Sequence, residues 1–283
     1  MICKELSQTF KSQRELFTAL KANKAEIIRL KKAAIKCSDP IGLSIVEAVS
    51  KTGQTVKGEP GQTLEYGDHI YPVINTTLYL DSHNDLHLNG IWDKSAMEQN
   101  GKTYYIINHD LAIGKVISYP QDVEIMVKDM AWTELGQNIA GRTQALIFKA
   151  KLTENSNQDA YKAIKSGAPI QNSIRMVYVD LDLAVNSKDP DFMPEKKIWD
   201  THYPAIANKD QADNVGYFWA VSEAKIYKEG SAVLFGSNDA TPVLTAEPKN
   251  IGPSQDTQDR AADRTRVKAE LKNLLLKTKK ITG

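Results

Sequence analysis

The sequence predicts an α+β fold in which a mainly antiparallel β-structure is surrounded by helices. Between residues 71 and 235, many short runs are rich in β-branched and aromatic residues, and turn-forming residues separate most of them. One clear helical stripe interrupts these runs at 157–166, where Ala160, Tyr161 and Ile164 share a face and Gly167 ends the helix. Many short strands with few helices favour an antiparallel barrel or sandwich over a parallel doubly wound sheet.

A basic amphipathic arm is expected at the N-terminus, over residues 1–37. Apolar side chains recur there at three-, four- and seven-residue steps, with no internal Gly or Pro, which predicts one long helix that stops at 38–40. Polar residues at inward heptad positions make docking on the body or on a partner more natural than a durable coiled coil. The apolar positions are Leu6, Phe10, Phe17, Leu20, Ile27 and Leu30, and the polar interruptions are Gln13, Lys24 and Lys31.

The central body is expected over residues 38–246. Gly and Pro punctuate it up to about residue 60, with a strand or short helix at 41–49. Strands are then expected at 71–80, 102–108, 115–119, 123–132, 145–152, 174–185, 217–227 and 231–235.

The C-terminal segment, 247–283, is expected to be a linker followed by a basic helix. Residues 247–258 contain Pro248, Gly252, Pro253 and Ser254, which is typical of a linker. Beyond them, Val267, Leu271, Leu274 and Leu275 form the apolar stripe of a last helix.

Charge is distributed unevenly along the chain. Residues 1–36 carry nine Lys or Arg against three Asp or Glu, and residues 260–283 carry eight against two, so each end has a net charge of +6. Residues 37–259 therefore carry −11, because the whole chain has a net charge of +1. Basic ends on an acidic body indicate either binding to an acidic protein surface or nucleic acid, or simply solvated helices with lysine-rich outer faces.

Several functional classes are disfavoured by composition. No apolar run reaches 18 residues and the N-terminus has no apolar signal core, so neither a membrane span nor secretory export is expected. Cys3 and Cys37 form no disulfide framework and no metal-ligand spacing, which favours an intracellular, reducing setting. No glycine-rich phosphate loop is present either. No cofactor is therefore expected.

Two histidines four residues apart, His83 and His87, form the most plausible metal motif. On a helix, this spacing would be a reasonable ligand pair. The surrounding residues are turn formers, which favours a loop or hairpin with solvated histidines, so no metal site is expected.

Three polar segments at the ends of β-like runs supply the groups of a serine hydrolase. His109 ends one run before the Gly114-Lys115 turn, Ser173 begins another, and Glu229 or Glu223 could lie behind the imidazole. Such an enzyme needs a hydroxyl, an imidazole that accepts its proton and a third group that holds the tautomer. A single His and Ser pair in a chain with five histidines is more often structural.

The order and surroundings of these segments resemble the prohead proteases of tailed bacteriophages, distant relatives of the herpesvirus assemblins. The resemblance covers about 79–243 and rests on five blocks in the same order. These are 81–95, His109-Asp110 with 113–116, the helical segment 160–168, Asn172-Ser173-Ile174, and 229–233 with Gly236-Ser237-Asn238. The resemblance implies an assemblin-like, mainly antiparallel β-barrel surrounded by helices.

Three departures from the family pattern stand out. Arg175 replaces a common Gly after Ser-Ile, and Gly236 replaces a common Pro, but neither change removes a catalytic atom. Residues 186–216 look like an insertion that either covers the substrate groove or, as we favour, forms a surface excursion. The insertion leaves the third triad member open, with Glu229 favoured by motif position and Glu223 as the runner-up.

The resemblance implies a His-Ser-Glu mechanism. Ser173 would attack a peptide carbonyl, His109 would pass the proton to the leaving amine, and Glu229 would orient the imidazolium. Backbone amides would stabilise the oxyanion with support from Arg175, for which the alternative is a surface residue paired with Asp180 or Asp182. Asp110 is expected to be a turn residue.

The resemblance also implies a biological setting. The chain would be a serine endopeptidase that cleaves phage scaffold protein, capsid protein extensions and itself, inside the prohead in the host cytoplasm. Its partners would be scaffold and major capsid proteins and a second copy of the chain in a homodimer. Neither a membrane nor nucleic acid as substrate is expected. The alternatives are a catalytically inactive capsid-interior scaffolding protein with this fold and an unrelated cytosolic serine hydrolase.

Overall fold

A computed structural model describes residues 1–36, 64–238 and 240–248, and residues 1–248 form one compact unit. Its helices are α1 (Gln13–Ala22), α2 (Lys24–Ala33), α3 (Asp93–Gln99), α4 (Gln158–Ser166), α5 (Met193–His202) and α6 (Lys209–Val215). Its strands are β1 (Ile2–Cys3), β2 (Gln8–Thr9), β3 (His69–Thr76), β4 (Asp85–His87), β5 (Tyr104–Ile107), β6 (Val116–Ser118), β7 (Val123–Ala131), β8 (Arg142–Lys151), β9 (Gln171–Val185), β10 (Tyr217–Val233) and β11 (Val243–Leu244).

Three sheets organise these strands, and most of the pairings are antiparallel. One sheet has the order β11-β3-β8-β7, a second has β4-β10-β5-β6 with β9 also paired to β10, and β1 pairs with β2. Only β4 and β5 run parallel to β10. The α+β class with antiparallel sheets is thus confirmed, whereas no closed barrel is seen among the described residues.

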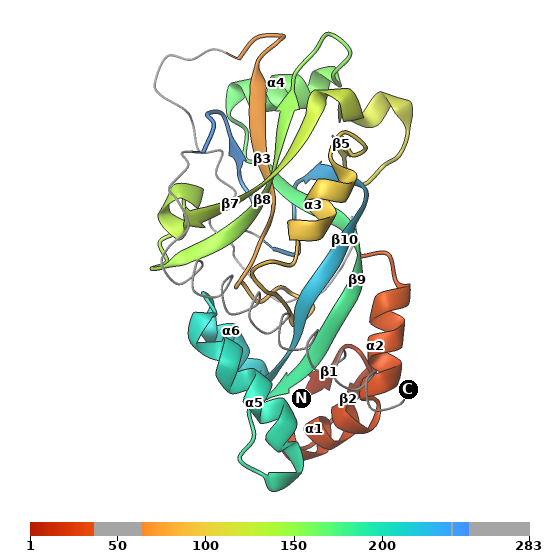
Figure 1. The fold of residues 1–283 in the computed structure, drawn as a ribbon, viewed down its shortest axis with the longest axis vertical. Coiled ribbons are helices and arrows are strands. Elements are labelled where there is room, and N and C mark those ends of the chain that lie inside the picture. The colour runs from red at the N-terminus through yellow and green to blue at the C-terminus, as the bar shows by residue number, and fades with distance from the viewer. Residues whose placement is uncertain (37–63, 239, 249–283) are drawn as a thin grey trace, which may run out of the picture. The chain divides into compact units, whose positions relative to one another are not determined.

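β9 and β10 form a long antiparallel pair, the β9–β10 pair, which is the backbone of the second sheet (Figure 1). Both strands are longer than the sequence predicts. β9 begins at Gln171 instead of residue 174, and β10 continues through Lys228-Glu229-Gly230 instead of ending before it. Lys228 has a positive φ of 72° and the register shifts between Ile226 and Gly230, which is a bulge. A bulge re-aims the side chains that follow it. The strands expected at 217–227 and 231–235 therefore belong to one bent strand, β10.

The N-terminal arm differs from the predicted single helix. It forms two helices, α1 and α2, separated at Asn23, whose backbone N–H and side chain both bond back to Ala19 O. Asn favours such local bonds over continued helix. Phe17, Leu20 and Ile27 are buried in the main core, and each contributes about 1.5–3 kcal/mol by leaving water.

Docking of this arm on the body confirms the expectation drawn from its apolar stripe. Figure 1 shows α2 alongside β9, and α2 contacts that strand directly. The lysines of the arm meet acidic residues of the body: Lys24 with Asp182, Lys32 with Asp180, Lys21 with Glu195, and both Lys31 and Lys36 with Asp85. The basic charge of this arm is therefore partly compensated within the same chain.

Residues 186–216 form α5, α6 and two 3-10 turns, Pro190–Phe192 and Tyr203–Ala205. Trp199, Ile206 and Ala212 form a small apolar cluster with Phe218 and Ala220 of β10. Phe192 packs edge-on against Phe17 of α1 at 6.0 Å between ring centroids. This segment therefore packs against β10 and the arm, and Gln211 also donates to Asp81 O at 2.7 Å. The choice between a surface excursion and a cover of the substrate groove stays a prediction.

Some expected elements fall outside the described residues. These are the segment at 41–49, most of the linker at 247–258 and the C-terminal helix with Val267 and Leu271. Among the described helices, none has the length and apolar character needed to cross a bilayer.

Candidate active site

His109 lies in a strained turn immediately after β5. Asn108 and His109 both have left-handed backbone conformations, with φ of 52° and 56°. Asn and His tolerate this region better than most residues, and consecutive left-handed residues turn the chain sharply. Asn108 N donates to Ala232 O at 2.9 Å, so the turn is held against β10. The His109 side chain is only 4% exposed.

The imidazole of His109 is paired with Glu229. Its Nδ1 lies 2.7 Å from Glu229 Oε1, and the Glu229 side chain is completely buried. Because a carboxylate is only an acceptor, Nδ1 carries the proton in the neutral ring. Nε2 is then the nitrogen that can accept a proton, which is the tautomer that a general base requires.

Ser231 fixes both partners of this pair, a role that the sequence did not suggest. Its hydroxyl donates to Glu229 Oε2 at 2.8 Å and accepts the His109 backbone N–H at 2.9 Å. Residues two apart on a strand share a face, so the Glu229-x-Ser231 spacing was an available signal. Ser231 therefore positions both His109 and Glu229.

Arg175 completes the surroundings of the carboxylate. Its Nε donates to Glu229 Oε1 at 2.8 Å, and a terminal nitrogen donates to the His109 carbonyl at 2.6 Å. The alternative of a surface pairing with Asp180 or Asp182 is therefore wrong, because the Arg175 side chain is 17% exposed and faces Glu229. These contacts hold the turn and the carboxylate together; oxyanion support by Arg175 remains a prediction.

Ser173 lies on β9 directly opposite Ser231 of β10. Cross-strand neighbours of this kind have Cβ atoms about 4.5–5.5 Å apart and point to the same face. Arg175, two residues further on, shares that face by strand alternation. The β9–β10 pair thus brings Ser173, Arg175, Glu229 and Ser231 together on one side, where His109 joins them.

Gly230 shows why this side is separate from the core. A Cβ at this position would lie 2.7 Å from the Phe148 ring and 3.0 Å from Ile74, so the opposite face of β10 is packed against buried apolar side chains. Only Gly permits that approach. Glu229 and Ser231 are therefore turned to the other face, toward His109.

The remaining carboxylates near the motif have other partners. Glu223, the runner-up for the third member, pairs with Lys94 at 3.0 Å near the surface. Asp110 accepts the backbone N–H of Ala112 at 3.0 Å, as expected of a turn residue. Of the two candidate glutamates, the fold brings Glu229 to His109.

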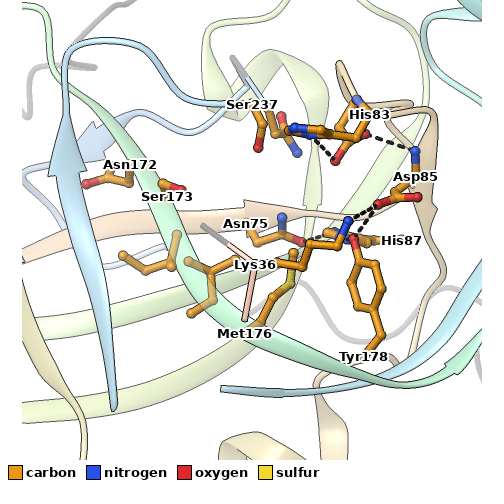
Figure 2. A pocket seen from close by; sticks show the side chains of 14 residues that line it. Lys36, Asn75, His83, Asp85, His87, Asn172, Ser173, Met176, Tyr178 and Ser237 are labelled. Carbon is orange, nitrogen blue, oxygen red and sulfur yellow. Dashed lines mark hydrogen bonds and ion pairs between the residues drawn. The ribbon is translucent and has the colours of Figure 1, made fainter. Parts of the chain in front are cut away.

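A pocket opens beside Ser173, and its other wall comes from β3, β4 and the end of the N-terminal arm. Figure 2 shows Ser173 and Asn172 on β9, with Lys36 reaching toward Asp85 and Tyr178. The lining residues are Lys36, Ile74, Asn75, Asp81, His83, Asp85, His87, Asn172, Ser173, Ile174, Met176, Tyr178, Ser237 and Asn238.

The structure places the two histidines of the expected solvated loop in different environments. His87 lies on β4 and is buried between Asn75, 3.0 Å from its Nδ1, and Tyr178, 3.1 Å from its Nε2. Burial lowers the pKa of His87. The solvated-histidine expectation is wrong for this residue, because a short strand enters the core despite its polar sequence.

Tyr178 connects His87 to a buried carboxylate. The hydroxyl lies 2.9 Å from Asp85 Oδ2, and burial together with that carboxylate raises the pKa of Tyr178 well above its ordinary value. A tyrosine hydroxyl has one proton, which it donates either to Asp85 or to neutral His87. No local sequence pattern predicts this network, because its members come from the arm, β4 and β9.

His83 remains half-exposed at the pocket rim, 3.9 Å from Asp81. The nearby Asp81 carboxylate raises the pKa of His83. Within the described ranges, no group of three or more His, Cys, Asp or Glu side chains could hold a metal ion.

No protein-family model, curated protein or solved structure matches this chain. The functional argument therefore depends on the contacts of His109, Glu229 and Ser173 and on their positions in the fold.

Proposed function

We propose that this chain is a serine endopeptidase of the prohead-protease type, with Ser173 as nucleophile, His109 as general base and Glu229 as the third member. The observation that carries the proposal is the buried 2.7 Å pairing of His109 Nδ1 with Glu229, on the face of the β9–β10 pair that also holds Ser173. A left-handed histidine against a fully buried glutamate is costly to maintain, and such features cluster at functional sites.

The mechanism follows from the tautomer. His109 Nε2 takes the Ser173 hydroxyl proton as Oγ attacks a peptide carbonyl, and the imidazolium then protonates the leaving amine. Water hydrolyses the acyl-enzyme by the same route in reverse. Glu229 stabilises the imidazolium, and Arg175 and Ser231 keep the carboxylate in position.

A barrel related to the assemblins is the fold that we propose for this activity. Its support is a set of hydrogen bonds between the two large sheets: Asn172 of β9 donates to Thr241 O from its backbone at 3.1 Å and from its side chain at 2.9 Å. Thr241 lies just before β11, the edge strand of the other sheet.

The proposed substrates are phage scaffold protein, capsid protein extensions and the chain itself, within the prohead. The acidic body and basic ends would suit binding to charged partners during assembly. Neither cofactor nor metal enters the proposed reaction.

Alanine variants test the proposal through two readouts. Ser173→Ala should abolish labelling by a fluorophosphonate probe and processing of co-expressed scaffold protein, and His109→Ala should reduce both by at least about a thousandfold, because triad members act as a unit. Ser237→Ala is the matched control, since Ser237 lines the same pocket and belongs to no proposed triad.

Unchanged processing in Ser173→Ala would refute the enzyme proposal. Such a result, with a folded chain that still enters proheads, would favour the non-catalytic scaffolding alternative. A probe attached to a serine other than Ser173 would instead indicate an unrelated serine hydrolase.

A further inference from the structure

We propose that the pocket beside Ser173 is a subsite for a basic side chain of a bound peptide, and that Lys36 of the chain itself occupies it. The inference rests on the proposed function, because it identifies how a peptide reaches Ser173. It concerns a region that the triad does not use: the outer edge of β9 and the buried carboxylate behind it.

The backbone of Lys36 is bound as an added strand. Lys36 N donates to Met176 O at 2.7 Å, and Met176 N donates to Lys36 O at 2.9 Å. The pair is antiparallel, and Met176 is three residues from Ser173 on the same strand. Proteins that bind extended peptides commonly use this mode, in which main-chain bonds supply affinity and pockets for alternate side chains supply specificity.

The Lys36 side chain lies in such a pocket. Figure 2 shows this side chain pointing toward Asp85 and Tyr178. Its Nζ lies 3.4 Å from Asp85 Oδ2 and 5.2 Å from the centre of the Tyr178 ring. A carboxylate together with an aromatic face is a favourable environment for an ammonium or guanidinium group. The Lys36 side chain is 22% exposed, whereas Asp85 is buried.

The charges around the pocket favour a cation at this position. Asp81 and Asp85 are both buried, and Lys31 pairs with the oxygen of Asp85 that Lys36 does not contact. Half-exposed His83 lies at the rim beside Asp81. Without Lys36, two carboxylates would face one lysine, so a lysine or arginine from another peptide would be attracted.

The strand direction places this subsite relative to the bond that is cut. In an antiparallel pair, a peptide that continues beyond its Met176 partner runs toward lower numbers on β9, and therefore toward Ser173. A peptide bound like Lys36 presents its basic residue on the N-terminal side of the attacked bond. The arm is thus a competitor in cis for substrate, with an effective concentration in the millimolar range typical of tethered ligands.

Peptide binding in a full-length Ser173→Ala background tests the subsite without catalysis. The probes are fluorescein-labelled peptides that copy residues 33–39, with lysine, norleucine or glutamate at the position of Lys36, and the readout is fluorescence anisotropy. Lys36→Met should bind the lysine peptide roughly tenfold more tightly than the parent, because the cis competitor has lost its charge. The norleucine and glutamate peptides should not show this gain.

Lys32→Met is the matched control, because Lys32 lies on the same arm but pairs, among the described residues, with Asp180 at 4.0 Å. Equal peptide affinities in the Lys36 and Lys32 variants, or equal binding of lysine and glutamate peptides, would overturn the proposal. Lys36→Gln replaces Lys36→Met if circular dichroism shows that the latter is unfolded. A lysine preference without fluorophosphonate labelling of Ser173 would leave the subsite standing and remove only the catalytic proposal.

Discussion

Replacing Glu229 by glutamine separates the charge of the buried carboxylate from its shape. Glu229 Oε1 accepts from both His109 Nδ1 and Arg175 Nε, so glutamine should keep its carbonyl oxygen toward these two donors. Its amide nitrogen then faces the Ser231 hydroxyl, which can turn to accept. The imidazole tautomer should therefore survive, and the main loss is the negative charge that stabilises the imidazolium.

The size of that loss follows from the contacts. Opposite unit charges about 4 Å apart interact by on the order of 4 kcal/mol at an effective dielectric constant near 20, and the amide dipole should retain part of this. We expect the barrier to rise by about 2–3 kcal/mol, which slows Ser173 labelling by roughly 30- to 150-fold. The unfolding free energy should fall by about 2–3 kcal/mol, because charge-assisted bonds to a buried group are lost and Arg175 keeps an uncompensated charge.

Fluorophosphonate labelling kinetics and urea unfolding measure the two effects. Glu223→Gln is the control, because Glu223 is on the same strand but pairs with Lys94 at the surface, where water screens the ion pair. The reasoning fails if the two glutamine variants label at the same rate or differ in stability by less than about 0.5 kcal/mol.

Two further predictions concern the packing beneath the site and its response to acid. Gly230→Ala should lower the free energy of unfolding by about 1–3 kcal/mol and slow labelling, because the added Cβ would lie 2.7 Å from the Phe148 ring. Gly114→Ala is the control and should change urea unfolding little, because a Cβ added there meets no atom within 4 Å. Equal effects of the two variants would contradict the packing argument. His87 has a pKa below its ordinary 6.5, so as the pH falls below 6.5 the unfolded chain binds a proton that the folded chain does not, and stability should decrease by at most about 1.4 kcal/mol per pH unit. His87→Gln should flatten this slope between pH 6.5 and 5 in urea titrations, and an unchanged slope would show that His87 is not the cause.

The strands of the body could be predicted from periodicity because each has its own hydrophobic run. The expected 123–132 and 174–185 segments correspond to Val123–Ala131 and Gln171–Val185, and the helix expected at 157–166 is Gln158–Ser166, capped by the Asn157 side chain. Local patterns are sufficient where burial alternates or a cap is present.

Elements without such a local pattern could not be predicted. Asp85-Leu86-His87 forms a fully buried strand although two of its three residues are polar, because their partners, such as Lys31 and Tyr178, come from distant segments. The arm illustrates the same limit. Its apolar stripe predicts docking, but that stripe continues across Asn23 and does not indicate that the chain breaks there into α1 and α2.

The choice between Glu223 and Glu229 shows which information is nonlocal. The two residues are six apart on β10, so simple alternation would put both on one face. Register shifts near Glu223 and between Ile226 and Gly230 remove that regularity, and the pairing of Ala232 with Ile107 brings the turn after β5 to the end where Glu229 lies. At about 3.3 Å per residue, Glu223 is on the order of 20 Å away along the strand. Motif order therefore indicates which segments meet, but only the parallel register of β5 on β10 determines which carboxylate His109 reaches.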